Sequence, residues 1–453
     1  MTETCDIAVI GAGSVGLATA HALATTHGIS RVVMIDSGDP MALTSAQSGE
    51  NYRNWWPHPV MTAFTDHAID LLETIATQTG NRIHMTRRGY ALATRRTAPA
   101  DLMGDLQRGY GDAASSLLRE HATAASPYQT PRSSQWDTAP DGVDILTNQD
   151  LIRRHFPSFA DDIATVIHIR RAGDISGQQL GQFMLEDIRA HGGRLQRARV
   201  AGIEVNKGFT LNLQTQDGPA SLHAGRIVNA AGPFIADIAK MLGETLNVSN
   251  VYQQKIAFED REAAIPRGMP FSIDLDGQTI AWTEEERDIL SADPDTAGLL
   301  APMPGGIHCR PEGGDGGTWV KLGWAFNEAA SSPHGEPPLI PHFPDIVLRA
   351  AGRLNPSLLR YLGRLPRAAR HYGGHYTMTP ENWPLIGPMQ TPGAFVAGAL
   401  SGFGTMAACA TGAVCAAWVT DTERPSYATA LSPQRTADEA LMRDLTAGNR
   451  GIL

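Results

Sequence analysis

The chain has 453 residues, enough for two or three domains and a large buried core. Hydrophobic residues at 42% and charged residues at 19% are typical of a globular protein and exclude a disordered one. The 37 basic and 47 acidic residues give a formal net charge of −10, which argues against a general nucleic-acid binder, because such proteins neutralise phosphates with Lys and Arg.

The four cysteines form no CxxC pair and no zinc-like spacing with histidine, so we expect neither a disulfide framework nor a metal site. The N-terminus lacks the basic start of a secretory signal, and a cytoplasmic location is the expectation. Residues 394–419 carry no charge and are long enough to span a bilayer. Gly402 and Gly404 interrupt this weakly apolar run, which favours a strand, a turn and a packed helix, and no membrane association is predicted.

The first forty residues read as strand, helix and strand. Residues 6–10 form an apolar run of strand length, residues 17–26 carry Ala and Leu at helical density, and residues 31–36 form a second buried strand. Continuous apolar strands joined through a helix predict a parallel sheet that is covered on both faces.

The rest of the chain contains five predicted features. In chain order, we predict first a helix over 65–79 and then a polar stretch over 96–140 with one or two helices. A second α/β stretch begins at 172, with a helix over 178–191 and strands over 199–205, 210–215 and 226–232. Short alternating strands over 251–320 and a final α/β unit from 394 follow. The alternating strands indicate a separate antiparallel layer.

Gly11, Gly13 and Gly16 have the spacing GxGxxG between the first predicted strand and the first predicted helix. In this context the first glycine makes a tight turn, the second lets the backbone approach a pyrophosphate, and the third allows close packing of helix on strand. The helix N-terminus offers N–H groups and partial positive charge to phosphate. Asp36 ends the next strand, where a carboxylate can accept hydrogen bonds from ribose hydroxyls. The pattern predicts a dinucleotide site and does not separate FAD from NAD.

Four stretches together resemble the D-amino acid oxidase superfamily of flavoproteins, the group that holds glycine oxidase, sarcosine oxidase and dimethylglycine dehydrogenase. The glycine motif through Asp36 is the first. The others are Ala172-Gly-Asp-Ile-Ser-Gly-Gln-Gln-Leu180, Ile227-Val-Asn-Ala-Ala-Gly-Pro233, and the pair Tyr376-Thr-Met-Thr-Pro-Glu-Asn-Trp-Pro-Leu-Ile-Gly387 with Val396-Ala-Gly-Ala-Leu-Ser-Gly-Phe-Gly404. The last pair is the most specific to this group.

The resemblance implies an α/β fold, α+β overall, in which a Rossmann-like FAD-binding domain joins a second domain built on an antiparallel sheet. The expected FAD-binding domain is discontinuous and takes residues 1–90, 150–240 and 376–453. Residues 91–149 are expected to form a surface excursion, and residues 241–375 to form the substrate-binding sheet.

The resemblance also implies which residues hold FAD. Gly374 stands where sarcosine oxidase has the cysteine that bonds its flavin, so noncovalent FAD is expected, although His371 and His375 leave a histidyl link open. The late glycines precede a helix whose N-terminus can stabilise negative charge on the flavin ring. The predicted FAD contacts are Gly11, Ala12, Gly13, Ser14, Val15, Gly16, Asp36, Ser37, Ser48, Arg53, Val200, Ala230, Gly232, Gly402, Phe403, Gly404, Thr405 and Met406.

Lys321 lies in Trp319-Val-Lys321-Leu-Gly-Trp324, which resembles the family segment whose lysine sits by the flavin and activates O2. A fixed ammonium suits this step, because electron transfer to O2 creates superoxide and a cation stabilises that charge. A solvated lysine on a sheet edge is the alternative. The chain has only four lysines, which favours the catalytic role.

The implied reaction is oxidation of a C–N bond in an amino acid or secondary amine, by hydride transfer to flavin N5, imine hydrolysis and reduction of O2 to H2O2. Two alternatives stay open. One is an FAD-dependent dehydrogenase of an amine or 2-hydroxy acid that uses a quinone or an electron-transfer protein. The other is a non-catalytic flavin-binding subunit of a hetero-oligomer. A small-molecule substrate and O2 are the predicted partners, and the oligomeric state is left open.

The predicted substrate pocket departs from the family. The family's histidine after the lysine segment falls on Ala325, and a lysine that binds the substrate carboxylate in sarcosine oxidase falls on Met406. Arg53 matches the family's first arginine in this region with one residue of slip, whereas Trp55 or Trp56 replaces the second arginine, the carboxylate partner.

Two explanations of this departure stay open. Either another cation, such as Arg310 or Arg367, holds an acid group, or the substrate is an amine without one. Tryptophans near the site would suit a bulky or aromatic substrate. The candidate substrate contacts are Trp56, Tyr252, Trp282, Arg310, Trp324, His371 and Tyr376.

Overall fold

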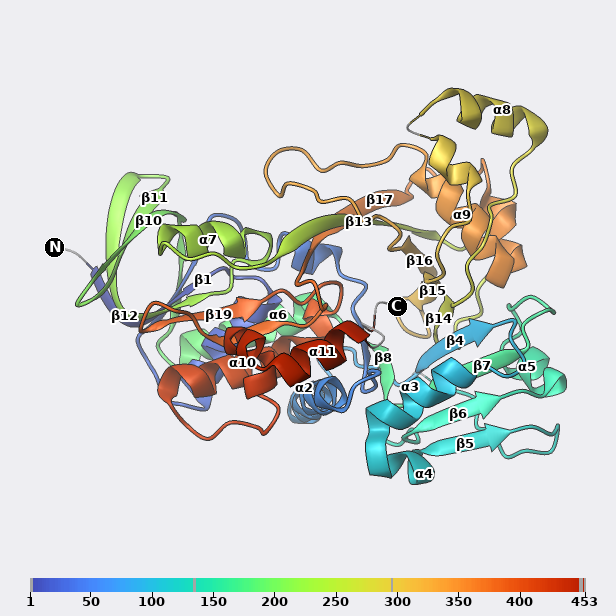
Figure 1. Ribbon diagram of the computed structural model, residues 1–453, viewed down its shortest axis with the longest axis horizontal. Coiled ribbons are helices and arrows are strands. Elements are labelled where there is room, and N and C mark those ends of the chain that lie inside the picture. Colours follow the sequence, from blue (N-terminus) through green and yellow to red (C-terminus); the bar gives the residue numbers. More distant parts are fainter. Residues whose placement is uncertain (1–2, 133–135, 295, 448–450, 452–453) are drawn as a thin grey trace.

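The computed structural model describes residues 3–132, 136–294, 296–447 and 451. Two large sheets lie toward opposite ends of the molecule, and helices pack against both (Figure 1). A short ladder of β3 (Asn51–Arg53) and β8 (Ala172–Asp174) connects the loop after β2 to the segment before α6. This arrangement confirms the predicted α/β fold with a Rossmann-like half and a second sheet.

The first sheet carries the glycine motif. Its central strands run in the order β19-β12-β1-β2-β9, and all neighbours in this run are parallel. Strands β10 and β11 continue from β12 in antiparallel fashion, and β18 pairs antiparallel with β19. The bounds are β1 Glu3–Ile10, β2 Val32–Asp36, β9 Arg194–Arg197, β10 Arg199–Asn206, β11 Gly208–Thr215, β12 Gly218–Asn229, β18 Leu385–Pro388 and β19 Ala394–Gly398.

Strand β1 is buried on both faces, as its continuous apolar run predicts. Ile7 and Val9 pack into a core with α1, α2, α6 and α10, whereas Ala8 and Ile10 pack into a second core with β10, β11 and α7. The helices have the bounds α1 Ser14–Thr25, α2 Pro59–Gln78, α3 Ala100–Tyr110, α4 Ala114–Leu117, α5 Gln149–His155, α6 Gly177–Ala190, α7 Ile235–Met241, α8 Glu284–Ala292, α9 Phe343–Leu354, α10 Gly404–Thr420 and α11 Glu439–Ala447.

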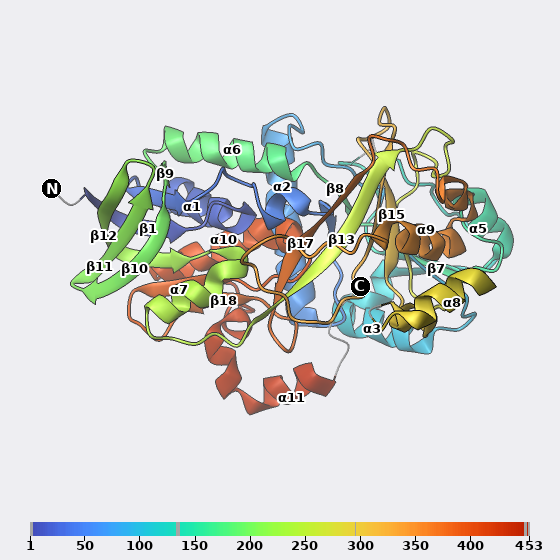
Figure 2. The same ribbon diagram turned by 90° about the horizontal axis from the view of Figure 1, so that it is seen from above.

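Helices α1 and α10, which begin about 390 residues apart in the chain, pack against each other on one face of this sheet (Figure 2). Gly412 makes the contact close, because a Cβ added there would lie 2.3 Å from the backbone carbon of Ala18. Each helix starts where a strand of the same parallel sheet ends. The two N-termini therefore lie at the same edge of the sheet.

The second sheet has the strand order β17-β13-β16-β15-β14-β4-β7-β6-β5 and is antiparallel except for the pairs β14–β4 and β5–β6. Helix α9 covers its outer face with a core of its own. The bounds are β4 Tyr90–Thr94, β5 Leu118–His121, β6 Val143–Leu146, β7 Thr165–Ile169, β13 Ser249–Glu259, β14 Phe271–Asp274, β15 Ile307–Glu312, β16 Trp319–Trp324 and β17 Arg370–Met378.

Residues 91–149 differ from the predicted surface excursion. They supply most of β4 and all of β5 and β6 to the second sheet, together with α3 and α4. Strands of four or five residues between stretches rich in Ala, Ser, Thr and Pro are too short to show a period, which explains why the sequence pattern does not reveal them.

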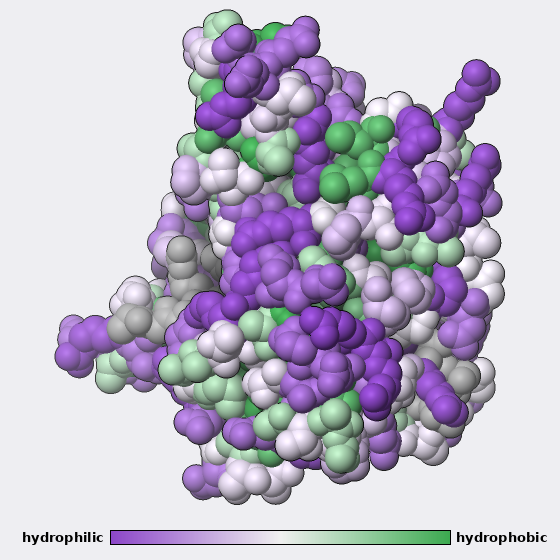
Figure 3. Space-filling view, turned by 90° about the vertical axis from the view of Figure 1, so that its right-hand side faces the viewer, coloured by the Kyte–Doolittle hydropathy of each residue, from purple (hydrophilic) through white to green (hydrophobic). Residues whose placement is uncertain are grey.

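Strands β13 and β17 form a long two-stranded ribbon that runs from the first half of the molecule into the second (Figures 1 and 2). The face of the second half that Figure 3 shows is largely hydrophilic, and its apolar residues form small separate groups. In the described ranges, no helix is long and apolar enough to cross a membrane. Residues 394–419 form β19, a turn and most of α10, as predicted.

The close approach of α1 and α10 predicts opposite effects for two glycine-to-alanine changes in helices. Gly412→Ala inserts a methyl group against backbone and is expected to lower the free energy of unfolding by about 1–3 kcal/mol. Gly104→Ala in α3, where a Cβ would meet nothing within 4 Å, is expected to raise it by about 0.5–1 kcal/mol.

Chemical denaturation of both variants beside the wild type measures these changes. Equal responses of the two variants would show that the helices do not depend on their contact at Gly412.

Candidate functional site

The turn between β1 and α1 has the geometry that a bound pyrophosphate requires. Gly11 has a φ of 110°, and a Cβ there would lie 2.3 Å from the carbonyl oxygen of Ala230. A Cβ on Gly16 would lie 2.0 Å from the carbonyl oxygen of Gly11, so helix and turn approach closely. Gly13 is the N-cap of α1 and provides no side-chain cap, which leaves the first turn of the helix for an anion.

Asp36 lies at the end of β2, beside this turn. Its two carboxylate oxygens accept hydrogen bonds from the backbone N–H groups of Ala12 (2.7 Å) and Gly38 (2.8 Å). A carboxylate has about four lone-pair sites, so each oxygen retains capacity for a ribose hydroxyl. Asp36 thus holds the glycine turn in place and fits the predicted ribose contact.

The start of α10 forms the other end of the predicted cradle. Ala399 and Ser401 have φ values of 56° and 48°, which are costly for residues with a side chain. Phe403, the N-cap, provides no side-chain hydrogen bond. A Cβ on Gly402 would lie 2.5 Å from the ring of Tyr376, so only glycine fits this position without a shift of that ring. Such a strained, uncapped helix start fits a group that develops negative charge.

Three further predicted FAD contacts, Ala230, Gly232 and Val200, lie near the same edge of the first sheet, whereas Ser48 and Arg53 lie on the loop that lines the cavity described below. Ala230 and Gly232 follow β12, and the backbone N–H of Ala230 bonds to Ile10 at the end of β1. Val200 is buried on β10, close to the end of β2. The backbone N–H of Ser14 bonds to the Ser45 hydroxyl at 3.0 Å. The residues present fit an FAD molecule that extends from Asp36 to the start of α10.

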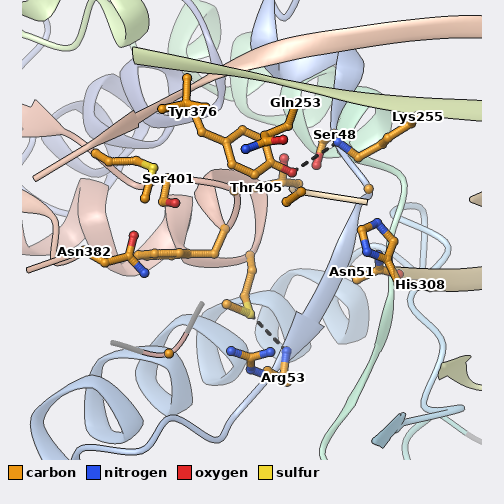
Figure 4. Close-up of a pocket in the computed structure, with 18 of the residues that line it drawn as sticks. Ser48, Asn51, Arg53, Gln253, Lys255, His308, Tyr376, Asn382, Ser401 and Thr405 are labelled. Atoms are coloured by element: carbon orange, nitrogen blue, oxygen red, sulfur yellow. Dashed lines mark hydrogen bonds between the residues drawn. The ribbon is translucent and has the colours of Figure 1, made fainter. Parts of the chain in front are cut away.

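A cavity of about 420 Å³ lies between the start of α10 and the second sheet (Figure 4). One wall consists of the loop 48–53 and the turn 401–406, and the opposite wall consists of β13, β15 and β17. Tyr376, Trp56 and Ala325 line it, together with Asn382 from the loop after β17. Its size is typical of a site for a small molecule.

Arg53 lies on the cavity wall and is only 5% exposed. Its backbone N–H donates to Met406 Sδ at 3.0 Å, and its Nε donates to the carbonyl oxygen of Trp55 at 3.1 Å. The guanidinium stacks over Trp56 at 4.8 Å from the ring centroid. Within the described residues it forms no ion pair, and burial lowers its pKa from the usual value. The cavity therefore contains a desolvated cation that a carboxylate would stabilise.

Lys321 does not line the cavity. Its Nζ lies 2.9 Å from Glu50 Oε2 and 2.9 Å from Glu312 Oε2, and Arg310 lies 2.7 Å from the same Glu312 oxygen. Arg310 also pairs with Asp174, which Arg88 contacts at 2.8 Å.

This group, which we call the charge cluster, has three cations (Arg88, Arg310, Lys321) and three carboxylates (Glu50, Asp174, Glu312). Burial by itself would raise the pKa of Asp174, but the neighbouring guanidinium groups outweigh it and hold the pKa below the usual value. The cluster is neutral as a whole and fixes the loop that carries Glu50. Arg310 therefore has a structural role in this cluster. It was predicted to contact the substrate, but it does not line the cavity.

Strand alternation explains why several predicted substrate contacts do not reach the cavity. On β13, Val251, Gln253 and Lys255 face it, so Tyr252 faces away and packs on His375.

The same alternation turns Trp324 into the core under α9 and His371 onto Phe343. Trp282 lies beside α8, and the guanidinium carbon of Arg349 lies 4.7 Å from the centroid of its ring. Of the seven candidates, only Trp56 and Tyr376 line the cavity.

Gly374 packs against the 3₁₀ turn Thr44–Gln47, where a Cβ would lie 3.3 Å from Gln47. His371 and His375 alternate to the far side of β17, and His375 bonds Ser331 at 3.2 Å. This placement supports noncovalent FAD.

Sequence reasoning missed Lys255, His308, Gln253 and Asn382 as cavity residues. Lys255, Gly323 and His308 form one cross-strand row over β13, β16 and β15. This row can be found only if the pairing of the strand that carries Lys321 with its neighbours is known. No local sequence pattern reveals that pairing.

His308 is uncharged at neutral pH. Burial, and next the Lys255 ammonium, lower the pKa of His308 to about 4. Its Nδ1 donates to the carbonyl oxygen of Gly306 at 3.1 Å, which leaves Nε2 directed toward the cavity as an acceptor.

Comparisons with known proteins place these features in a family context. The family model described as FAD dependent oxidoreductase matches residues 6–418. Similar solved structures include L-proline dehydrogenase from P. horikoshii (16% identity, TM-score 0.72, covering 97% of this chain and 99% of that chain).

Glycine oxidase from Geobacillus kaustophilus is also similar, with 17% identity and a TM-score of 0.66, covering 93% of this chain and 96% of that chain. Iminodiacetate oxidase from Chelativorans sp. BNC1 has 18% identity and a TM-score of 0.64, covering 94% of this chain and 98% of that chain. A comparison with curated protein sequences finds no match.

The low pKa of His308 predicts a pH-dependent stability. Between pH 6.5 and about 4 the unfolded chain binds a proton at this side chain and the folded chain does not, so the free energy of unfolding falls as the pH is lowered through this window. His308→Gln lacks this titration and should lose less stability over the same window. Denaturation of the FAD-loaded protein from pH 7.5 to 4.5 measures the difference.

His191→Gln, at the exposed end of α6, is the control and should follow the wild type. A His308→Gln profile that runs parallel to the wild type would contradict a buried, uncharged His308.

Proposed function

The chain belongs to the FAD-dependent oxidoreductase family, and on that basis we propose that it oxidises the C–N bond of an amino acid or secondary amine whose carboxylate binds Arg53. The family match confirms the resemblance to the D-amino acid oxidase superfamily and FAD as the cofactor. The observation that carries the proposal is Arg53, a cation that is 5% exposed, lines the cavity and has no ion-pair partner among the described residues.

A buried guanidinium without a counter-charge is costly, and a bound carboxylate offsets this cost through charge-assisted hydrogen bonds. The rings of Trp55, Trp56 and Tyr90 lie 4.8–5.9 Å from the guanidinium carbon. Among the described residues only Nε of this group has a hydrogen-bond partner, which leaves its other nitrogens for a ligand. Arg53 would thus supply a carboxylate contact in place of the family's lysine, which falls on Met406, and of its second arginine, which falls on Trp55 or Trp56. It would do so in place of the flavin-edge contact that the family resemblance implies.

The chain's own residues would orient the substrate and exclude water. When bound, FAD supplies the oxidising capacity and accepts the electrons. Arg53 would hold the carboxylate, and the rings of Trp56 and Phe403, which pack together at 4.7 Å, would keep water from that end of the cavity. His308, uncharged, adds no positive charge beside the substrate amine. The similar structures are named for enzymes of proline, glycine and iminodiacetate, all of which combine an amine with a carboxylate.

We propose O2 as the electron acceptor and Lys321 as the residue that favours its reduction, which makes the protein an oxidase. One observation favours a second candidate. Lys321 contacts two carboxylates, Glu50 and Glu312, both at 2.9 Å, and these neutralise the charge that would stabilise superoxide. A dehydrogenase that passes electrons to a quinone or an electron-transfer protein is therefore the alternative.

The substrate proposal predicts which compounds bleach the bound flavin without oxygen. In a panel of N-methyl amino acids, D-amino acids, cyclic amino acids, simple amines and 2-hydroxy acids, we expect amino acids to bleach it. Arg53→Met should raise the half-saturating concentration of the best amino acid at least about 100-fold, equivalent to about 2.7 kcal/mol. Arg53→Lys should recover part of this loss.

The same variants should change the half-saturating concentration of an amine without a carboxylate by less than about threefold. Bleaching by 2-hydroxy acids alone, or equal effects of Arg53→Met on both classes, would contradict the role of Arg53. No bleaching by any compound would favour a non-catalytic subunit.

The acceptor proposal predicts the effect of Lys321→Met. If Lys321 aids O2 reduction, flavin reduction should stay normal, and reoxidation by air should slow at least about 100-fold because the ammonium is lost. Stopped-flow absorbance at the flavin band measures both steps, with peroxide release as a second readout. Slow reoxidation in the wild type that Lys321→Met leaves unchanged would favour the dehydrogenase.

A further inference from the structure

Lys255 is a second buried cation of the cavity. It is 5% exposed, and its place on β13 directs it to the cavity side (Figure 4). Its Nζ donates to the hydroxyl of Tyr376 at 3.2 Å and lies 5.3 Å from the centroid of that ring. In the ranges that the structure describes, no carboxylate pairs with it. A lysine that is almost fully desolvated and faces a cavity without a counter-charge points to a ligand.

The neighbouring strands are shaped to admit this side chain. Gly323 lies between Lys255 and His308 in the cross-strand row. A Cβ on Gly323 would lie 2.4 Å from His308 Nε2 and 3.0 Å from Lys255 Cγ. The glycine thus makes room for a cation and an uncharged imidazole to lie side by side on the cavity wall.

The acidic side chains of the cavity do not neutralise Lys255. Glu50 is paired with Lys321 and also lies 3.6 Å from Arg310. Glu328 lies at the rim and is exposed to solvent. Arg53 and Lys255 therefore remain as two desolvated cations, one beside the start of α10 and one on the second sheet.

We propose that the substrate is an amine with two carboxylates, of which one binds Arg53 and the other binds Lys255 together with the Tyr376 hydroxyl. This inference rests on the proposed function and names its substrate class. Two anionic groups compensate the two buried cations, and their separation on two walls places the amine between them. A substrate with one carboxylate leaves Lys255 buried without compensation.

Two analogues that cannot be oxidised at nitrogen test the second carboxylate. Oxydiacetate has two carboxylates on an ether oxygen, and methoxyacetate has one. By calorimetric titration, the FAD-loaded wild type should bind oxydiacetate at least about tenfold more tightly than methoxyacetate, as expected for one charge-assisted hydrogen-bonded contact. Lys255→Met should abolish this preference and change the affinity for methoxyacetate by less than about twofold.

Matched variants separate a binding role from a folding defect. Lys240→Met removes a lysine whose side chain is 72% exposed and should keep the wild-type preference. Tyr376→Phe keeps the ring and removes the hydroxyl, so it should weaken oxydiacetate alone, by about three- to tenfold. The visible spectrum of bound FAD verifies that each variant is folded.

The proposal would be overturned if the wild type did not prefer oxydiacetate over methoxyacetate, or if both Lys255→Met and Tyr376→Phe kept the wild-type preference. It would also be overturned if Lys255→Met lost affinity equally for both analogues, because Lys255 would then bind the carboxylate that both share. Neither analogue is a substrate, so this outcome is independent of turnover. Binding of oxydiacetate through Lys255 by a protein whose flavin no amine bleaches would refute the proposed function and retain the two-cation site.

Discussion

The contact between α1 and α10 is the constraint on which the rest of the structure depends. Gly412 brings the second helix against the backbone of Ala18, and both helices start at the same edge of one parallel sheet without a side-chain cap from their N-cap residues. An uncapped helix N-terminus attracts negative charge, and two of them at one edge can hold two separate parts of an extended anionic cofactor. The positive φ angles of Ala399 and Ser401 cost conformational free energy, and binding of such a cofactor would offset this cost.

The second sheet supplies the other wall and, with it, the chemistry that distinguishes this chain. Its charge cluster is balanced, three cations against three carboxylates, and this balance holds the loop of Glu50 in place. The cavity beside it is not balanced, because Arg53 and Lys255 have no carboxylate partners in the described residues. A structural ion network and the proposed ligand site thus lie next to each other and differ in whether their charges are paired.

The FAD half could be predicted because its signals are local. The glycine turn, Asp36 and the late Gly402–Gly404 turn each lie within a short stretch, and the structure places all of them at one edge. The substrate half depends on strand pairing, which no local pattern gives. A shift of one residue decides whether Lys255 or Tyr252 faces the cavity. The short strands within residues 91–149 escaped detection because four residues cannot establish a period.

The most direct test of this account is the titration of apoprotein with FAD, FMN and ADP, followed by flavin fluorescence and by competition. If α1 holds the pyrophosphate end and α10 the ring end, the chain takes up one FAD tightly, and FMN and ADP each bind far more weakly, because each contacts only one helix start. Correctly folded protein that stays colourless with FAD, or that binds FMN as tightly as FAD, would contradict it.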